Sequence, residues 1–258
     1  MDFRAAIKAL YARKAEESDL WYPYCFASQA AFGALNRVRA MGYAEAELNR
    51  VPLESIMGLG CGNPFCLIEP APGDSVLDLG CGGGMDAFLA LRHIGSNGQV
   101  IGIDITEQMV RKARIAAALH GFRNVVFHIG EMEHLPLEDE SVDVLMSNFA
   151  ISLSPDKARV FQEAFRVLRP GGRLGICEVA CAGGGRRVPV PEETEAWIWH
   201  AAGPLEAQAY ADLVSEAGFE AVEFAGERDF EMDGCRDSVP AVSVGIRARK
   251  PAVSRGER

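Results

Sequence analysis

Residues 75–84 constrain the fold of this chain more than any other stretch. They read Ser-Val-Leu-Asp-Leu-Gly-Cys-Gly-Gly-Gly, an apolar run that is broken by one acid and followed by clustered glycines. Apolar residues at helical spacing come next, from Met85 to Leu91. A strand, a tight turn and a helix in this order open a doubly wound α/β sheet. Glycines at such a turn let a ligand reach the backbone, because a side chain would block its approach.

The glycine spacing argues against a dinucleotide cofactor. The G-x-G-x-x-G fingerprint needs its third glycine three positions after the second, where this chain has Met85. A second acid, Asp104, ends the β-rich run 99–104 and follows the turn by about 20 residues, where a carboxylate can bind a ribose diol. The alternative is that Asp104 only begins a loop. The turn and the acid together predict a site for an adenosyl ribose.

Composition narrows the class of protein. With 258 residues the chain can form one large α/β domain with a cap, and its net charge of −10 argues against a nucleic-acid partner. The N-terminus lacks the apolar core of a signal peptide and no later segment could span a bilayer, so we expect a cytoplasmic protein without membrane contact. Seven scattered cysteines indicate reduced thiols, and their spacing predicts no metal site.

The order of elements predicts a mostly parallel, doubly wound sheet of seven strands. We expect an N-terminal helical cap over 1–54, the main domain over 55–250 and a disordered tail over 251–258. The last two strands, 221–230 and 241–249, are expected to close the sheet as an antiparallel edge. Ser154 is expected to cap the helix that follows the strand 142–148, with Pro155 in its first position. A broken helix over 194–210 is expected to form a lid.

These motifs resemble those of class I S-adenosylmethionine-dependent methyltransferases, whose first motif matches the glycine turn behind Asp78. The resemblance is closest to arsenite methyltransferases and rests on four landmarks, at 60–64, 130–133, 147–157 and 205–219. It implies a Rossmann-like fold, S-adenosyl-L-methionine as the cofactor and a small-molecule substrate.

The resemblance also implies which residues contact the cofactor. Met109 is placed to pack on adenine, although a methionine at this spacing can equally be ordinary core. Glu131 and Met132 lie in the loop that frames the adenine amino group in the family. The full set implied is Asp78, Gly80, Cys81, Gly82, Asp104, Ile105, Met109, Glu131, Met132 and Asn148.

The residues expected to bind the substrate differ from those of the arsenite methyltransferases. The resemblance implies that those enzymes hold trivalent arsenic on three cysteine thiolates. Cys61 matches the first of these, but Phe149 and His200 stand at the other two positions. Replacing two thiolates by a phenyl and an imidazole should remove most of the affinity for a soft arsenic centre. We therefore expect methylation of a small organic acceptor, with substrate contacts from Phe149, Cys61, Tyr24 and Trp197.

The sequence is also compatible with two other functions. An arsenite methyltransferase could use Cys61 with Cys25 or Cys66, and a protein that only binds S-adenosylmethionine would need no catalytic group. We expect His200 to act with Asn148 in catalysis, as a general base or by orienting the acceptor, because the ordinary pKa of histidine suits proton removal near neutral pH. Equally, His200 could only pack within the lid.

Overall fold

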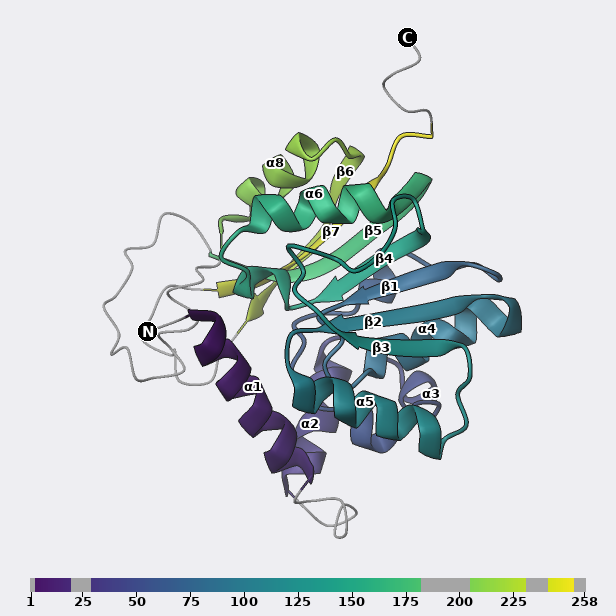
Figure 1. Ribbon diagram of the computed structural model, residues 1–258. Coiled ribbons are helices and arrows are strands. Elements are labelled where there is room, and N and C mark those ends of the chain that lie inside the picture. Colours follow the sequence, from purple (N-terminus) through teal and green to yellow (C-terminus); the bar gives the residue numbers. More distant parts are fainter. Residues whose placement is uncertain (1–2, 20–28, 182–204, 231–240, 253–258) are drawn as a thin grey trace.

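The computed structural model describes residues 3–19, 29–181, 205–230 and 241–252. Seven strands form one sheet in the order β3-β2-β1-β4-β5-β7-β6 (Figure 1). They are β1 (Ser75–Leu79), β2 (Gln99–Asp104), β3 (Val125–Ile129), β4 (Val142–Asn148), β5 (Leu168–Cys181), β6 (Glu220–Phe230) and β7 (Ala241–Arg249). Strands β1 to β5 are parallel. The predicted fold class, a mostly parallel doubly wound sheet of seven strands, is confirmed.

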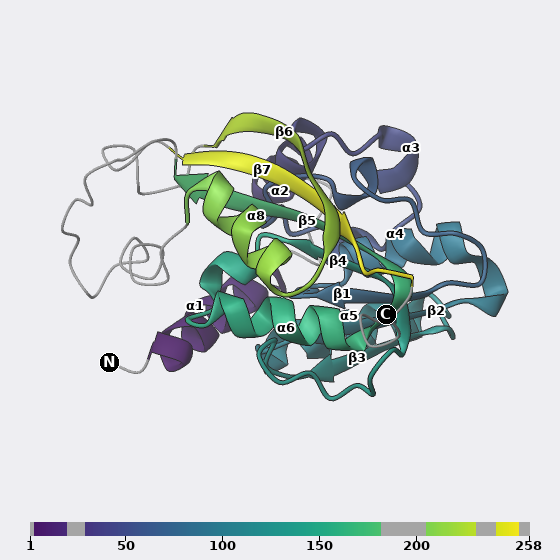
Figure 2. The same cartoon turned by 90° about the horizontal axis from the view of Figure 1, so that it is seen from above.

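The C-terminal edge of the sheet differs from the expectation in one respect. Strand β7 inserts between β5 and β6 and pairs antiparallel with both (Figure 2). Strand β6 therefore runs in the direction of β5, and only β7 is antiparallel to the rest. Alternating polarity in two adjacent strands cannot reveal this order, because it depends on which strand contacts β5.

Helices cover both faces of the sheet. They are α1 (Phe3–Asp19), α2 (Gln29–Ala40), α3 (Glu45–Leu48), α4 (Met85–Ile94), α5 (Glu107–Leu119), α6 (Lys157–Val167) and α8 (Ala207–Glu216). Helices α6 and α8 pack on one face and α4 and α5 on the other (Figure 1). In β1, Leu77 and Leu79 point toward the first helix pair and Val76 toward the second. Burial on both faces explains why this strand is a nearly continuous apolar run.

The N-terminal helices pack outside this core. Apolar residues of α1 contact Ile105 and Leu153, which follow β2 and β4. Helix α2 and the segment after it pack against Leu89 of α4. These contacts support the proposal of a helical cap within the same chain. Residues 194–204 of the expected lid and most of the expected tail lie outside the described residues, whereas residues 207–210 belong to helix α8, which packs on the sheet.

Helix α6 begins two residues later than predicted. Its N-cap is Asp156, whose Oδ1 accepts a hydrogen bond from the Arg159 N–H at 3.0 Å. Ser154 is not the cap because its hydroxyl instead donates to Glu133 at 2.5 Å and accepts from the Asp156 N–H. A long-range partner for the serine therefore overrides the local capping pattern.

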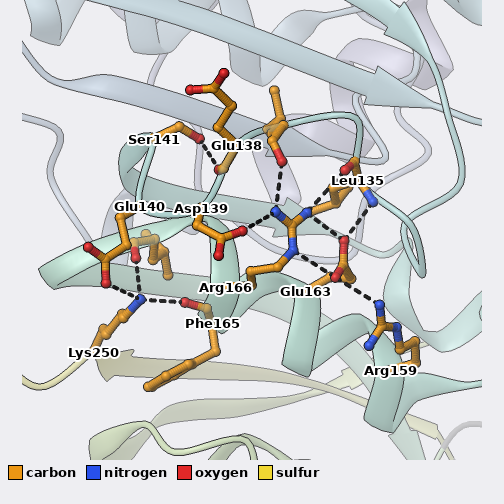
Figure 3. A network of polar contacts seen from close by, with 12 residues as sticks. Leu135, Glu138, Asp139, Glu140, Ser141, Arg159, Glu163, Phe165, Arg166 and Lys250 are labelled. Atoms are coloured by element: carbon orange, nitrogen blue, oxygen red, sulfur yellow. Dashed lines mark hydrogen bonds and ion pairs between the residues drawn. The ribbon is translucent and has the colours of Figure 1, made fainter. Parts of the chain in front are cut away.

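A buried acid of α6 ties this helix to the loop before β4. Glu163 is 3% exposed and lies between Arg159 and Arg166 (Figure 3). Its oxygens accept from Arg166 Nη2 at 2.7 Å, from Arg159 Nη2 at 3.1 Å and from the Leu135 N–H at 2.8 Å. Arg166 also donates to the Leu137 carbonyl at 2.7 Å. The cationic neighbours, Arg166 first, lower the pKa of Glu163.

Three findings concern the described residues as a set. No helix among them is both long enough and apolar enough to cross a membrane. The five cysteines in these segments form no disulfide. Nowhere in the same segments do three His, Cys, Asp or Glu side chains converge as a metal site requires.

Candidate active site

A cleft opens where the strand order reverses. Strand β1 lies between β2 and β4, and ligands of open α/β sheets bind at the carboxyl ends of the strands beside such a point. The empty volume of the cleft, including its mouth, is about 1140 Å³. Its walls come from the loops after β1, β2, β3 and β4, from the glycine loop 57–60 and from helices α1 and α2.

The glycine turn after β1 forms part of the cleft wall. Gly80 has a φ of 78°, and a Cβ there would lie 2.1 Å from the Cβ of Ala150. Gly82 has a φ of 51°, and a Cβ there would meet no atom within 4 Å. Gly80 therefore lets the turn pass the chain after β4, while Gly82 exposes backbone to the open cleft.

Asp104 ends β2 beside this turn. Its Oδ2 accepts from the Gly82 N–H at 2.9 Å and its Oδ1 from the Thr106 N–H at 2.8 Å. Burial raises the pKa of Asp104, and the two backbone N–H groups oppose that rise. Each carboxylate oxygen keeps a further lone pair. The carboxylate is thus held in place at the cleft with acceptor capacity to spare, as binding of a ribose diol requires.

Asp78 supplies an acceptor without a partner. It is 2% exposed, lines the cleft, and its Oδ2 has no hydrogen-bond partner among the described residues. Burial, with repulsion from Asp86 and Asp104, raises the pKa of Asp78. A buried polar atom without a partner costs about 1–3 kcal/mol. This oxygen therefore fits a ligand that brings a cation or a hydrogen-bond donor, and S-adenosylmethionine carries an ammonium and a sulfonium.

A polar network closes the other side of the turn. Asp86, in the first turn of α4, accepts from the Tyr43 hydroxyl at 2.6 Å and from Asn148 Nδ2 at 3.2 Å. Asn148 Nδ2 also lies 3.1 Å from the Tyr43 hydroxyl. Burial raises the pKa of Asp86 to about 6, although the hydrogen bonds from Tyr43 and Asn148 oppose the rise. No local sequence pattern predicts Tyr43 or Asp86 as site residues, because their contact spans 43 residues of the chain.

Asn148 also fixes the second glycine loop. Its Oδ1 accepts from the N–H groups of Cys61 at 2.9 Å and Gly62 at 3.2 Å, and its Nδ2 donates to the Gly62 carbonyl at 2.9 Å. A Cβ at Gly60 would lie 2.5 Å from Asn148 Nδ2. The loop is therefore held by hydrogen bonds to the end of β4, and it is glycine-rich because Asn148 leaves no room for a side chain.

Two of the four expected substrate residues, Phe149 and Cys61, lie in one cluster. Phe149 lines the cleft with a φ of 61°, a strained conformation for a bulky residue, and packs edge-on against Phe230 at 5.3 Å between ring centroids. Cys61 belongs to the same buried cluster as Phe149, and so does Cys177. Burial raises the pKa of both thiols, so both stay protonated near neutral pH.

Most of the expected cofactor residues line the cleft. The cleft is lined on the side of β2 and β3 by Ile105, Met109 and Met132. Around the glycine turn it is lined by the other expected cofactor residues, namely Asp78, Gly80, Cys81, Gly82, Asp104 and Asn148. Glu131 instead forms an ion pair with Arg4 of α1 at 3.1 Å. Tyr24, Cys25, Trp197 and His200 lie outside the described residues. Helix α1 adds wall residues that the sequence analysis did not include, namely Arg4, Ile7 and Tyr11.

Comparison with known proteins agrees with this geometry. A family model described as a methyltransferase domain matches residues 70–217. An arsenite methyltransferase of Halobacterium salinarum is 41% identical over 222 residues, covering 82% of this chain and 56% of that protein. The nocamycin O-methyltransferase of Saccharothrix syringae is 36% identical over 149 residues, covering 58% of this chain and 49% of that protein. The chain thus spans about half the length of these two relatives.

A solved structure supports the same relationship. The arsenic(III) S-adenosylmethionine methyltransferase of Chlamydomonas reinhardtii has 30% sequence identity and a TM-score of 0.61 to this chain. The similarity covers 85% of this chain and 74% of that one. The family model covers more than half of the chain and includes the glycine turn, Asp104 and the cleft walls that follow β1 to β4. The chain belongs to the class I S-adenosylmethionine-dependent methyltransferase family and is related to the arsenite methyltransferases.

Proposed function

We propose that this protein transfers a methyl group from S-adenosylmethionine to a small organic acceptor. The observation that carries the proposal is the arrangement of Asp104, the glycine turn and the unpartnered Oδ2 of Asp78 around one cleft. In this assignment Asp104 binds the ribose, the turn passes close to the methionine part, and Ile105, Met109 and Met132 bind the adenine.

The bound cofactor would supply an already activated methyl group on a sulfonium. The residues of the chain then have to align the acceptor with the methyl–sulfur bond and keep water out. Asn148 and Phe149 follow one another at the end of β4 and line the cleft, so we assign them to the acceptor side. His200 is proposed to orient the acceptor or to remove its proton, and Tyr24 and Trp197 are proposed to contact it.

Two features favour an organic acceptor over arsenite. Phe149 lines the cleft, whereas Cys61 lies in the same buried cluster without lining it, and an aromatic ring offers no ligand to trivalent arsenic. The O-methyltransferase among the relatives is named for an organic substrate. Similarity to arsenite methyltransferases supports the second candidate, in which Cys61 acts with Cys25 or Cys66.

Calorimetry on the Asp104→Ala variant tests the proposal. Loss of the ribose hydrogen bonds should cost about 1–3 kcal/mol of binding free energy, that is about 5- to 150-fold in affinity. Asp212→Asn, an exposed acid on α8, is the matched control and should bind as the wild type does. Unchanged affinity in Asp104→Ala would contradict the assignment, and preferential binding of a nicotinamide dinucleotide would overturn the proposed function.

Turnover separates the enzyme from the non-catalytic alternative. A protein that only binds S-adenosylmethionine should produce no S-adenosylhomocysteine with any member of a panel of phenols, amines and thiols. We expect at least one acceptor in such a panel to be methylated.

A further inference from the structure

More carboxylates line the cleft than a ribose needs. Asp78, Asp86 and Asp104 all line it, together with Glu133. Arg4 is the one cation among the described residues of the lining, and it is paired with Glu131 at 3.1 Å and Glu133 at 3.5 Å. The described walls therefore carry an excess of negative charge, which favours a cationic ligand.

The proposed function assigns only Asp104 to the ribose, which leaves Asp86 available for another part of the ligand. The Tyr43 hydroxyl holds its Oδ1 and Asn148 Nδ2 holds its Oδ2, so its orientation is fixed from two different elements. Because Asn148 ends β4, Asp86 lies on the β4 side of the glycine turn, whereas Asp104 lies on the β2 side. This is the side on which the proposed function puts the acceptor and hence the reacting sulfur.

The surroundings of Asp78 favour a cationic ligand group near Asp86 and Asp104. Burial first, and then repulsion from Asp86 and Asp104, raises the pKa of this cleft-lining acid, and its buried Oδ2 has no hydrogen-bond partner among the described residues. A positive charge bound there would be attracted by all three carboxylates. A sulfonium is a permanent positive charge, whereas the thioether that remains after methyl transfer is neutral.

We propose that Asp86, held by Tyr43 and Asn148, is the residue that makes this cleft prefer the positively charged sulfonium cofactor over its neutral thioether product. The inference rests on the proposed function, since it needs the cofactor in this cleft. Methyl transfer moves the methyl carbon to the acceptor and leaves the bonding electron pair on sulfur, which removes the positive charge. The attraction to Asp86 then ends, and the product leaves more readily in exchange for new cofactor.

The test compares three ligands that differ in charge at one position. S-Adenosylmethionine carries the sulfonium, sinefungin carries an ammonium in its place, and S-adenosylhomocysteine is neutral there. Each is titrated by calorimetry into wild type, Asp86→Asn and the control Asp212→Asn at pH 7.5. Asp86→Asn should weaken the two charged ligands about tenfold and change the neutral one less than twofold, because only the charged ligands lose a Coulomb partner. The control should leave all three unchanged.

Asp86→Glu keeps the charge and separates electrostatics from a folding defect. It should retain most of the preference for the charged ligands, provided that its circular dichroism matches that of the wild type. Equal weakening of all three ligands in Asp86→Asn would refute the charge role of Asp86 while leaving the proposed function intact. Absence of binding of any of the three to the wild type would contradict the proposed function itself.

A pH series on the wild type gives a readout that needs no variant. The groups that face Asp86 are Tyr43, Asp78 of β1, Glu47 of α3 and Cys177 of β5. The ratio of affinities for S-adenosylmethionine and S-adenosylhomocysteine should fall as the pH drops through about 6, where Asp86 takes up a proton. This step should be missing in Asp86→Asn, and its persistence there would assign it to another acid and refute the inference.

Discussion

Replacing Asp86 by Asn should make the ligand-free protein more stable near neutral pH. Asp86 is 8% exposed, and burial raises its pKa from 3.8 to about 6 even though Tyr43 and Asn148 donate hydrogen bonds to it. A rise of about two pH units corresponds to about 3 kcal/mol of unfavourable free energy when the group is ionised. Asparagine keeps the shape without the charge, so we expect a gain of about 2 kcal/mol after imperfect replacement of the hydrogen bonds.

The sign of the pH dependence follows from the raised pKa. The folded protein binds the proton of Asp86 more tightly than the unfolded chain does. The contribution of this group to stability is therefore complete below its unfolded pKa of 3.8 and is lost as the pH rises through about 6. The stability gain of Asp86→Asn should accordingly be largest at pH 7.5 and close to zero near pH 4.

Urea unfolding followed by circular dichroism measures this difference. Wild type, Asp86→Asn and the control Asp212→Asn are compared at pH 4.5 and pH 7.5, with free energies of unfolding obtained by linear extrapolation. The reasoning is refuted if Asp86→Asn is less stable than the wild type at pH 7.5. That result would mean that the ionised carboxylate stabilises the fold through Tyr43 and Asn148 by more than its burial costs.

Three further predictions concern the acceptor and the fold. Incubation with arsenite, glutathione and S-adenosylmethionine should give no rapid formation of methylarsenicals, because Phe149 offers no thiolate; rapid formation would point to Cys25 or Cys66 joining Cys61. With an identified acceptor, His200→Ala should lower turnover about 10²- to 10⁴-fold while cofactor affinity is retained. His200→Gln should restore turnover only if the histidine orients the acceptor and does not remove a proton. Near-normal turnover in both variants would make this histidine structural. Glu163→Gln should lower the free energy of unfolding by about 2 kcal/mol at pH 7. Since the pKa of Glu163 is lowered from its ordinary 4.5, this loss should shrink only below pH 4.5 and vanish once the pH falls through the lowered pKa, and a loss that persists in fully protonating acid would refute the ionic explanation.

Local patterns were enough to predict that the glycine turn and Asp104 meet in one cleft. The glycine turn and Asp104 each follow a strand, and parallel strands bring their carboxyl ends to the same edge of the sheet. Their meeting in one cleft therefore needed only the prediction of a parallel sheet. The Asp104–Gly82 hydrogen bond at 2.9 Å is the direct consequence.

The remaining parts of the site depend on contacts that no local pattern signals. Tyr43 reaches Asp86 only because α2 and the segment after it pack against α4. Helix α1 lines the cleft through apolar contacts with Ile105 and Leu153, and an amphipathic pattern does not say which surface a helix will cover. Ser154 bonds Glu133 rather than capping α6 for the same reason. Tertiary packing decided each of these positions.

A crystal structure with S-adenosylhomocysteine tests the central claim most directly. The account predicts the ribose hydroxyls on the carboxylate of Asp104, the adenine between Met109 and Met132, and the sulfur on the β4 side of the glycine turn. Density for the nucleoside in any other place, with the cleft around Asp78 and Asp104 left empty at saturating ligand, would contradict it.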